Sequence, residues 1–200
     1  MKRIIVLAML AGALLPMTAW ASAIEIINKY GPVSIFNSGI VCKGSELVGF
    51  DRIIAPKGHS LGSVSFSTGA LATGSLQTGG TFSAFGSSFA VMGKGNYGEP
   101  KGTIFVGLFA GPIRWTKISQ NGGNLVFLLS GDVDGTMYTG RFIDLATKET
   151  IDTTTRQLAK GIGHVSGGRT QVAPEPGSLA LIGTGLVGIA RAAWRRLAAR

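Results

Sequence analysis

Glycine is the residue that most restricts what the middle of this chain can form. Of the 31 glycines in the 200-residue sequence, 26 lie between Ile24 and Ala173, about one residue in six, against about 7% in an average protein. Glycine is a poor helix former, and no long apolar pattern with a helical period runs through this region. Short apolar runs separated by Gly, Ser, Thr and Asn are typical of many short strands. We therefore predict an all-β domain over residues 24–173.

The spacing of turn residues suggests how these strands connect. Asn121-Gly122-Gly123 and Gly111-Pro112 are turn sequences, and Leu125–Leu129 is a continuous apolar run that predicts a central strand. Asp134-Gly135 separates two apolar runs and predicts a β-hairpin turn. A turn every 8 to 12 residues fits an antiparallel β-sandwich or a partly open barrel.

Two stretches depart from this pattern. Residues 60–80 are poor in large apolar side chains, which predicts an edge region or a mobile loop. Residues 146–160 contain the one plausible helix of the region, but three consecutive threonines favour a strand or a loop.

The first 23 residues have the three parts of a secretory signal peptide in order. Lys2 and Arg3 form a positive start, Ile4–Leu15 is apolar, and Ala21-Ser22-Ala23 is a small-x-small cleavage site. We expect the Sec translocon and signal peptidase to act on this segment, with Ala21 and Ala23 forming the cleavage site and the mature chain beginning near Ile24. The alternative interpretation is a buried N-terminal helix.

The C-terminal end is also organised in parts. Pro174-Glu175-Pro176 cannot lie inside a helix, and an uncharged stretch follows over 177–190. Arginines close the chain at Arg191, Arg195, Arg196 and Arg200. As a helix the uncharged stretch is about 21 Å long, or about 27 Å if it continues to Trp194, which approaches a hydrocarbon core of about 30 Å. We predict a transmembrane helix whose arginines determine topology and leave the C-terminus in the cytoplasm.

The order Pro-Glu-Pro, hydrophobic helix and arginine cluster resembles the PEP-CTERM sorting signal of Gram-negative bacteria. The resemblance covers residues 174–200 and implies that exosortase, an integral membrane protease-transpeptidase, recognises Pro174, Glu175 and Pro176 and cuts nearby. A permanent single-pass anchor is the alternative, with the same topology. Stretches such as GTFSAFGSSFAVMGKG and LVFLLSGDVDG are also similar to small secreted PEP-CTERM proteins, a likeness that implies no particular site.

Residues that could carry catalysis are few and far apart in the sequence. His59 and His164 each lie beside glycine, and a Cys42–His dyad has no flanking signature. Ser88 lacks the second glycine of a nucleophile elbow, and residues 161–166 miss the third glycine of a dinucleotide fingerprint. We predict no catalytic residue and no cofactor.

Asp132-Val133-Asp134-Gly135 is the one candidate metal site. Two carboxylates one residue apart in a turn can bind calcium. An EF-hand would require a glutamate at the twelfth position, where the chain has Ile143. A hairpin turn with exposed aspartates accounts for the same residues, so Asp132 and Asp134 are kept as candidate ligands without a predicted metal.

The net charge of +9 does not indicate nucleic-acid binding. The signal peptide carries +2 and the tail from Pro174 carries +3, so residues 24–173 carry only +4. Their basic residues occur singly, without interleaved aromatics. We expect no nucleic-acid partner.

Together these features predict an exported, non-enzymatic protein of the cell envelope or extracellular matrix. It is at the membrane during sorting and afterwards at the envelope, at the surface or outside the cell. The PEP-CTERM resemblance implies a link to exopolysaccharide and biofilm.

Two other functions remain open. A carbohydrate- or surface-binding module would present a row of exposed aromatics, for which Trp115, Tyr97 and Tyr138 are the candidates. A small secreted hydrolase would require Asp132, Asp144 or His164 to converge in a pocket.

Overall fold

The computed structural model describes residues 24–172. The predicted signal peptide (1–23) and the predicted sorting signal with its transmembrane helix (174–200) lie outside the described residues. Within them are thirteen strands and one short helix, in the order β1 (Glu25–Lys29), β2 (Gly31–Phe36), β3 (Gly39–Phe50), β4 (Ile53–Ile54), β5 (Gly62–Ser67), β6 (Leu71–Ser75), β7 (Gly79–Phe82), β8 (Ser88–Gly93), β9 (Gly102–Phe109), β10 (Ile113–Asn121), β11 (Asn124–Met137), β12 (Phe142–Thr154), α2 (Thr155–Ala159) and β13 (Ile162–Val172). None of these elements is a helix long and apolar enough to cross a membrane.

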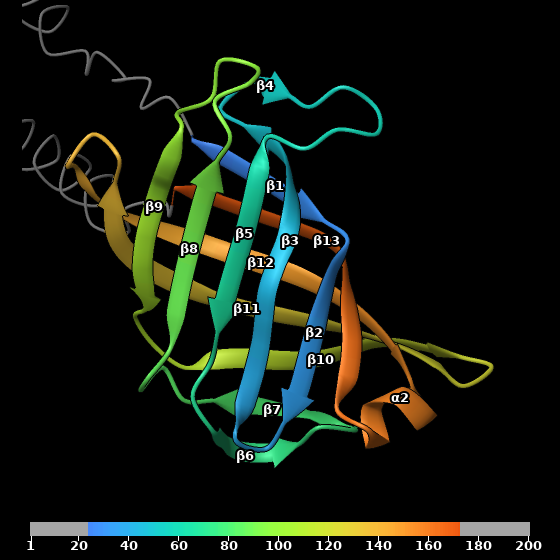
Figure 1. Ribbon diagram of the computed structural model, residues 1–200. Helices are drawn as coiled ribbons and strands as arrows, with labels where there is room; N and C mark the ends of the chain where they lie inside the picture. Colours follow the sequence, from blue (N-terminus) through green and yellow to red (C-terminus); the bar gives the residue numbers. More distant parts are fainter. Residues whose placement is uncertain (1–23, 173–200) are drawn as a thin grey trace, which may run out of the picture.

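Eight strands close into an antiparallel barrel. The pairing runs β2–β3–β5–β8–β9–β11–β12–β13 and returns from β13 to β2. In Figure 1, β3, β5, β8 and β9 cross in front of β11, β12 and β13. The all-β antiparallel prediction is confirmed, but the sandwich and the partly open barrel are wrong. The barrel closes because β12 pairs with β11 on one side and with β13 on the other, which leaves that strand no free edge.

β1 and β2 share one place in the barrel wall. Both lie between β3 and β13, β1 against one half of those strands and β2 against the other. Tyr30 joins them with a φ of 55°, and its N–H donates to the carbonyl of Val165 at 2.9 Å. A single kinked strand therefore completes the wall.

The sheet branches at β11. The first half of this strand pairs with β10 and the second half with β9. β10 continues the sheet into β7 and β6, which lie across the lower end of the barrel in Figure 1. The N–H of Leu71 on β6 donates to the carbonyl of Asn37, in the β2–β3 turn, at 2.8 Å. This contact ties the branch back to the wall.

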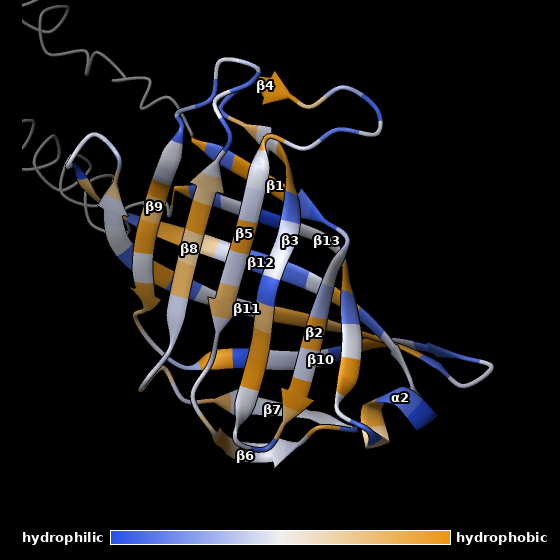
Figure 2. Cartoon of the chain, viewed as in Figure 1, coloured by the Kyte–Doolittle hydropathy of each residue, from blue (hydrophilic) through white to orange (hydrophobic). Residues whose placement is uncertain are grey.

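The interior is apolar and rich in aromatic side chains. Buried and outward residues alternate along β2, β5 and β12, and bands of opposite hydropathy follow one another along the strands in Figure 2. Trp115 is 1% exposed and stacks on Phe127 with 4.2 Å between ring centroids. Its Nε1–H donates to the carbonyl of Leu76 at 3.0 Å. Trp115 therefore joins β10, β11 and the β6–β7 turn.

The hairpin predicted at Asp134-Gly135 is wrong. Both residues lie inside β11, and the chain turns later, over 138–141, where Gly140 has a φ of 78°. Gly135 faces the interior, where a Cβ atom would lie 2.5 Å from Cζ of Phe105. The glycine thus allows close packing against an aromatic ring and makes no turn.

The other local predictions fare better. The turn at 121–123 is confirmed, with φ of 55° at Gly122 and 87° at Gly123. Residues 60–80 divide: β5 lies within the barrel wall, whereas β6 is an edge strand as expected. Residues 146–154 form a strand, as the threonines indicated, but 155–159 form one helical turn.

We predict that Trp115→Ala lowers the free energy of unfolding by about 3–5 kcal/mol, because it leaves a large cavity and removes the stacking on Phe127. Urea unfolding followed by far-ultraviolet circular dichroism measures the change. The control is Phe85→Ala, at a side chain 91% exposed, for which a change within about 0.5 kcal/mol is expected. Equal losses in the two variants would contradict the assignment of Trp115 to the core.

Candidate functional site

A cluster of polar side chains lies inside the otherwise apolar barrel. It consists of Asn28 on β1, Ser45 on β3, Thr147 and Glu149 on β12, and Thr170 on β13, all of them buried. A carboxyl group is seldom buried without a charged partner. This cluster is therefore the most unusual chemical environment of the described residues.

Strand register brings the two central members together. Asn28, Gly168 and Glu149 occupy neighbouring positions on β1, β13 and β12. Because Gly168 has no side chain, Asn28 Nδ2 reaches across it and donates to Glu149 Oε2 at 2.8 Å. A Cβ atom at position 168 would overlap both Glu149 Oε2 and Asn28 Oδ1. The glycine is thus required for the contact.

Hydroxyl groups surround the other carboxyl oxygen. Thr147 Oγ1 donates to Glu149 Oε1 at 3.5 Å, and it lies 2.7 Å from Thr170 Oγ1 on the neighbouring strand. These two threonines also occupy paired positions on β12 and β13. The hydroxyls give the carboxyl group polar neighbours but no positive charge.

The amide of Asn28 is only partly satisfied. Its Nδ2 also donates to Ser45 Oγ at 2.7 Å, while its Oδ1 accepts no hydrogen bond from the described residues. A buried acceptor without a donor costs about 1–3 kcal/mol.

Burial raises the pKa of Glu149 to about 7, against the opposing hydrogen bonds from Asn28 and Thr147. Burial likewise raises the pKa of the Cys42 thiol, and the nearby Glu149 carboxylate adds to the rise. Burial thus favours the neutral form of both groups. Because Glu149 is fully buried, the cluster can take up and release a proton but does not contact a substrate.

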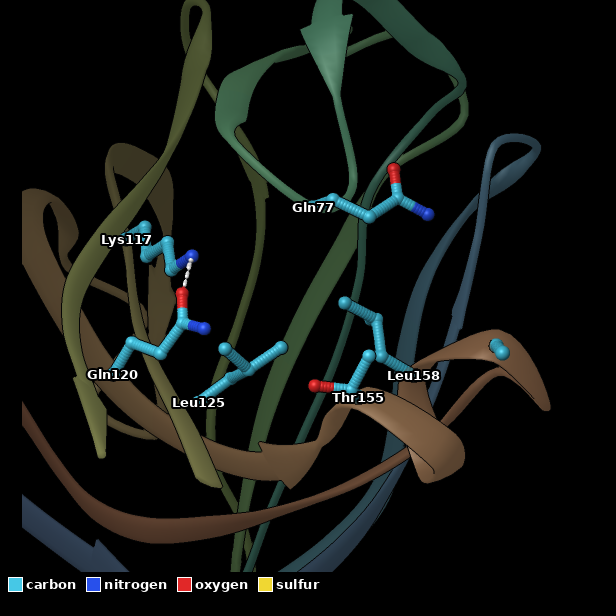
Figure 3. A pocket seen from close by; sticks show the side chains of 7 residues that line it. Gln77, Lys117, Gln120, Leu125, Thr155 and Leu158 are labelled. Carbon is cyan, nitrogen blue, oxygen red and sulfur yellow. Dashed lines mark hydrogen bonds between the residues drawn. The ribbon is translucent and has the colours of Figure 1, made fainter. Parts of the chain in front are cut away.

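A second candidate site is a small pocket at the surface, where α2 meets β10 and β11 (Figure 3). Its volume is about 220 Å³, smaller than the roughly 300–1,000 Å³ usual for ligand pockets. Leu125 and Leu158 form an apolar base, with polar groups around it. These polar side chains are Gln77, Lys117, Gln120 and Thr155.

Local sequence positions this pocket. α2 begins at a capping box: Thr154 Oγ1 accepts from the N–H of Gln157 and Gln157 Oε1 accepts from the N–H of Thr154, each at 3.1 Å. On the opposite wall, Lys117 Nζ donates to Gln120 Oε1. Amide, ammonium and hydroxyl groups around an apolar base can bind a small polar group such as one sugar ring.

The candidate metal ligands lie on the outside of the barrel wall. Asp132 and Asp134 are part of β11 and not of a turn, and Asp134 pairs with Asp144 on β12. Partial burial, followed by the charges of Asp144 and Asp132, raises the pKa of Asp134. Among residues 24–172, no group of three or more His, Cys, Asp or Glu side chains is arranged to hold a metal ion.

The catalytic candidates do not converge. His164 pairs with Asp152 on the outer face, and Asp152 is eight residues along β12 from Asp144. Cys42 is buried in the core. Ser88 exchanges a hydrogen bond of 2.7 Å with Ser67, and His59 lies in a loop beside Tyr97.

The candidate aromatics form no row. Trp115 is buried, whereas Tyr97 and Tyr138 are exposed. Tyr97 lies in the β8–β9 loop and Tyr138 in the β11–β12 turn. The arrangement expected of an aromatic carbohydrate platform is thus absent from the described part of the chain.

Sequence reasoning missed the buried cluster, although one signal was present. Glu149 follows Ile143 and Leu145 and precedes Ile151 at the same parity, so strand alternation places a carboxyl group on the apolar face. Asn28 likewise follows Ile26 by two residues. Their contact was hidden, because it joins residues 121 positions apart.

Comparison with known proteins identifies the C-terminal segment alone. A family model for the PEP-CTERM protein-sorting motif matches residues 172–196, which confirms the predicted resemblance. The match includes Pro174-Glu175-Pro176 and three of the four arginines, and Arg200 lies beyond it. No curated protein and no solved structure matches the chain. The motif implies export and exosortase-dependent sorting at the membrane.

We predict that Glu149 makes the protein less stable as the pH rises. Its pKa is about 7 in the native state and about 4.5 when exposed, so the native state binds the proton more tightly. The stabilisation of the native state by this tighter proton binding is complete below pH 4.5 and is lost as the pH rises to about 7. It amounts to about 3 kcal/mol in total. Glu149→Gln, which is permanently neutral, should lack this loss.

Urea unfolding at pH 4.5, 6 and 8 tests this. The decrease in the free energy of unfolding between pH 4.5 and pH 8 should be about 3 kcal/mol greater in the native protein than in Glu149→Gln. Glu46→Gln, at an exposed carboxyl on β3, is the control and should follow the native protein. Parallel pH profiles for the native protein and Glu149→Gln would show that burial does not perturb this group.

Proposed function

From the PEP-CTERM motif at residues 172–196, we propose that this chain is an exported, non-enzymatic protein of the cell envelope or extracellular matrix that exosortase sorts through this motif. The observation that carries the proposal is the motif itself. The position of the barrel supports it, since β13 ends at Val172, where the match begins. The wall closes with residues that precede Pro174, so cleavage near Pro-Glu-Pro leaves the barrel whole.

The positions of the first and last strands of the barrel, β1 and β13, fit this route. Glu25 on β1 pairs with Gln171 on β13, so the chain enters and leaves the barrel side by side. The Sec translocon and signal peptidase would free the chain near Ala23, two residues before β1. The opposite end would remain held at the membrane by the segment after Pro176 until exosortase cuts it. The released product would be the barrel alone.

A structural role fits the chemistry of the described residues. On the surface, the aspartates around Asp134 lie eight residues along β12 from the Asp152–His164 pair. The acid with the strongly raised pKa, Glu149, is buried in the core. The proposal therefore places no reaction on this barrel. A role within an exopolysaccharide matrix is part of the proposal and rests on the PEP-CTERM resemblance.

A carbohydrate-binding module is the second candidate, because of the pocket beside α2. Its polar rim of amide, ammonium and hydroxyl groups suits sugar hydroxyls, and its size suits a single ring. This mode of binding would not use stacking on Trp115, which is in the core.

We predict that sorting depends on the Pro-Glu-Pro tripeptide. In an exosortase-positive host, the native chain should lose the segment after the tripeptide and leave the membrane fraction. A variant with Ala at positions 174, 175 and 176 should retain the segment and stay with the membrane, as should the native chain in an exosortase-deficient host. Intact-mass analysis of fractionated cells measures the outcome.

The control for this experiment is Glu46→Ala, which also removes one acidic side chain but on the exposed surface of β3. It should be processed like the native chain. If the tail remains attached in both hosts, the motif acts as a permanent anchor and the sorting proposal fails.

For the second candidate, we predict binding of an immobilised saccharide that a Lys117→Ala, Gln120→Ala double variant weakens at least tenfold. Glycan-array screening followed by calorimetry with the best saccharide measures this. The matched control is Lys94→Ala, which removes an exposed lysine near Ser60, away from α2. No binding on the array, or equal binding by the two variants, would exclude the pocket as a sugar site.

A further inference from the structure

The outer face of β10, β11, β12 and β13 carries an acidic group and a basic group at different positions along the strands, and Asp152 lies four residues beyond Lys148 on β12. We call the two groups the acidic end and the basic end of this outer face. The acidic end comprises Asp132, Asp134 and Asp144, and the basic end comprises Arg114, Lys148 and Arg169.

The acidic end brings like charges together. Asp134 and Asp144 are direct cross-strand partners, and Asp132 is two residues away from Asp134. Like charges in directly opposed positions destabilise a sheet. In the described residues, the one ion pair joins Arg169 to Glu25, so no cation there neutralises the acidic end.

The basic end repeats this arrangement with the opposite sign. Lys148 pairs with Arg169 on one side and with Ser130 on the other, and Ser130 in turn pairs with Arg114. Three basic residues thus lie in one row across four strands. Arg169 is bonded to Glu25, whereas Arg114 and Lys148 form no ion pair with the described residues.

The acidic end and the basic end are close together, and a small side chain on β12 lies between them. Asp134 and Ser130 are four residues apart on β11, about 14 Å along the strand. Between the Asp134 row and the Ser130 row, Asp132 on β11 pairs with Ala146 on β12, whose side chain is small. A flat partner could therefore approach both ends at once.

We propose that this outer face docks against the same face of a second copy of the chain. In an isologous dimer each surface must complement itself. A two-fold axis that lies in the interface and runs across the strands places the acidic end of each copy on the basic end of the other. Rotation about the strand direction instead would oppose like charges, so the charge pattern selects one orientation.

An apolar flank adds to this surface. Leu108 on β9 pairs with Asp134, and Val106 lies two residues before it. Their side chains are 61% and 54% exposed. The two residues extend the outer face beyond the acidic end, where burial in a dimer would remove them from water.

The size of the surface indicates how tightly the copies would bind. Four strands about 4.8 Å apart and six or seven residues long cover roughly 400 Å², half the area of a standard interface, about 800 Å² per partner. The dimer should therefore be weak and transient. It should also weaken with salt, because charges at this distance are screened over about 10 Å at 0.1 M.

Charge-reversal variants of the full chain in mild detergent test the proposal by analytical ultracentrifugation. At about 50 mM salt the native chain should dimerise with a dissociation constant that rises at least tenfold at about 500 mM. Arg114→Glu with Lys148→Glu should weaken dimerisation at least tenfold, and Asp134→Lys with Asp144→Lys should do the same. An equal mixture of the two variants should restore dimers, because each then supplies the complementary charges.

The matched control reverses two exposed lysines elsewhere, Lys43→Glu with Lys57→Glu, and should dimerise like the native chain. Circular dichroism of each variant checks that the barrel is intact. A monomer at 200 µM in low salt overturns the proposal, as does association that both reversals leave unchanged. Loss in the Arg114/Lys148 variant alone, without rescue in the mixture, would show that the basic end binds another anionic partner. The dimer is independent of tail cleavage, so failure of either proposal leaves the other standing.

Discussion

Closure of the barrel by β12 is the constraint on which the rest of this structure depends. An unpaired strand edge leaves a row of backbone N–H and C=O groups without partners. β12 removes two such edges at once, since it pairs with β11 over thirteen positions and with β13 over eight. The same pairing aligns Glu149 with Gly168 and sets the acidic end beside the basic end. The interior cluster and the charged outer face therefore both depend on the register of β12, whose alternate residues face inward and outward.

The glycine content acquires a different meaning in the folded chain. Some glycines make turns, as Gly122 and Gly140 do with positive φ. Others lie within strands where a Cβ atom would collide with the neighbouring chain: Gly135 against Phe105, Gly168 against Glu149, and Gly62 against the carbonyl of Met92. A narrow barrel filled with aromatic rings needs such positions, because they allow strands and side chains to approach closely. Much of the glycine therefore serves packing.

The charges of the domain follow a similar division. One carboxyl group, Glu149, is enclosed with hydroxyl and amide groups, and burial raises its pKa to about 7. Other carboxyl groups stand on the outside in a cluster of one sign, next to a cluster of the opposite sign. The first arrangement couples stability to pH, and the second supplies a surface for recognition.

By itself, the sequence determined the features that depend on local order. The all-β class follows from short apolar runs and glycine, the turn at Gly122-Gly123 from two adjacent residues that tolerate positive φ, and the sorting motif from a contiguous segment around Pro174. The tertiary structure decided whatever depends on register. Asp134-Gly135 has the local form of a turn, yet pairing with β12 on one side and β9 on the other keeps it within a strand. Asn28 and Glu149 meet although 121 residues separate them, because two strand pairings place Gly168 between them. Cross-strand contacts arise from the pairing of distant segments, and no local pattern in the chain encodes which residues will face each other.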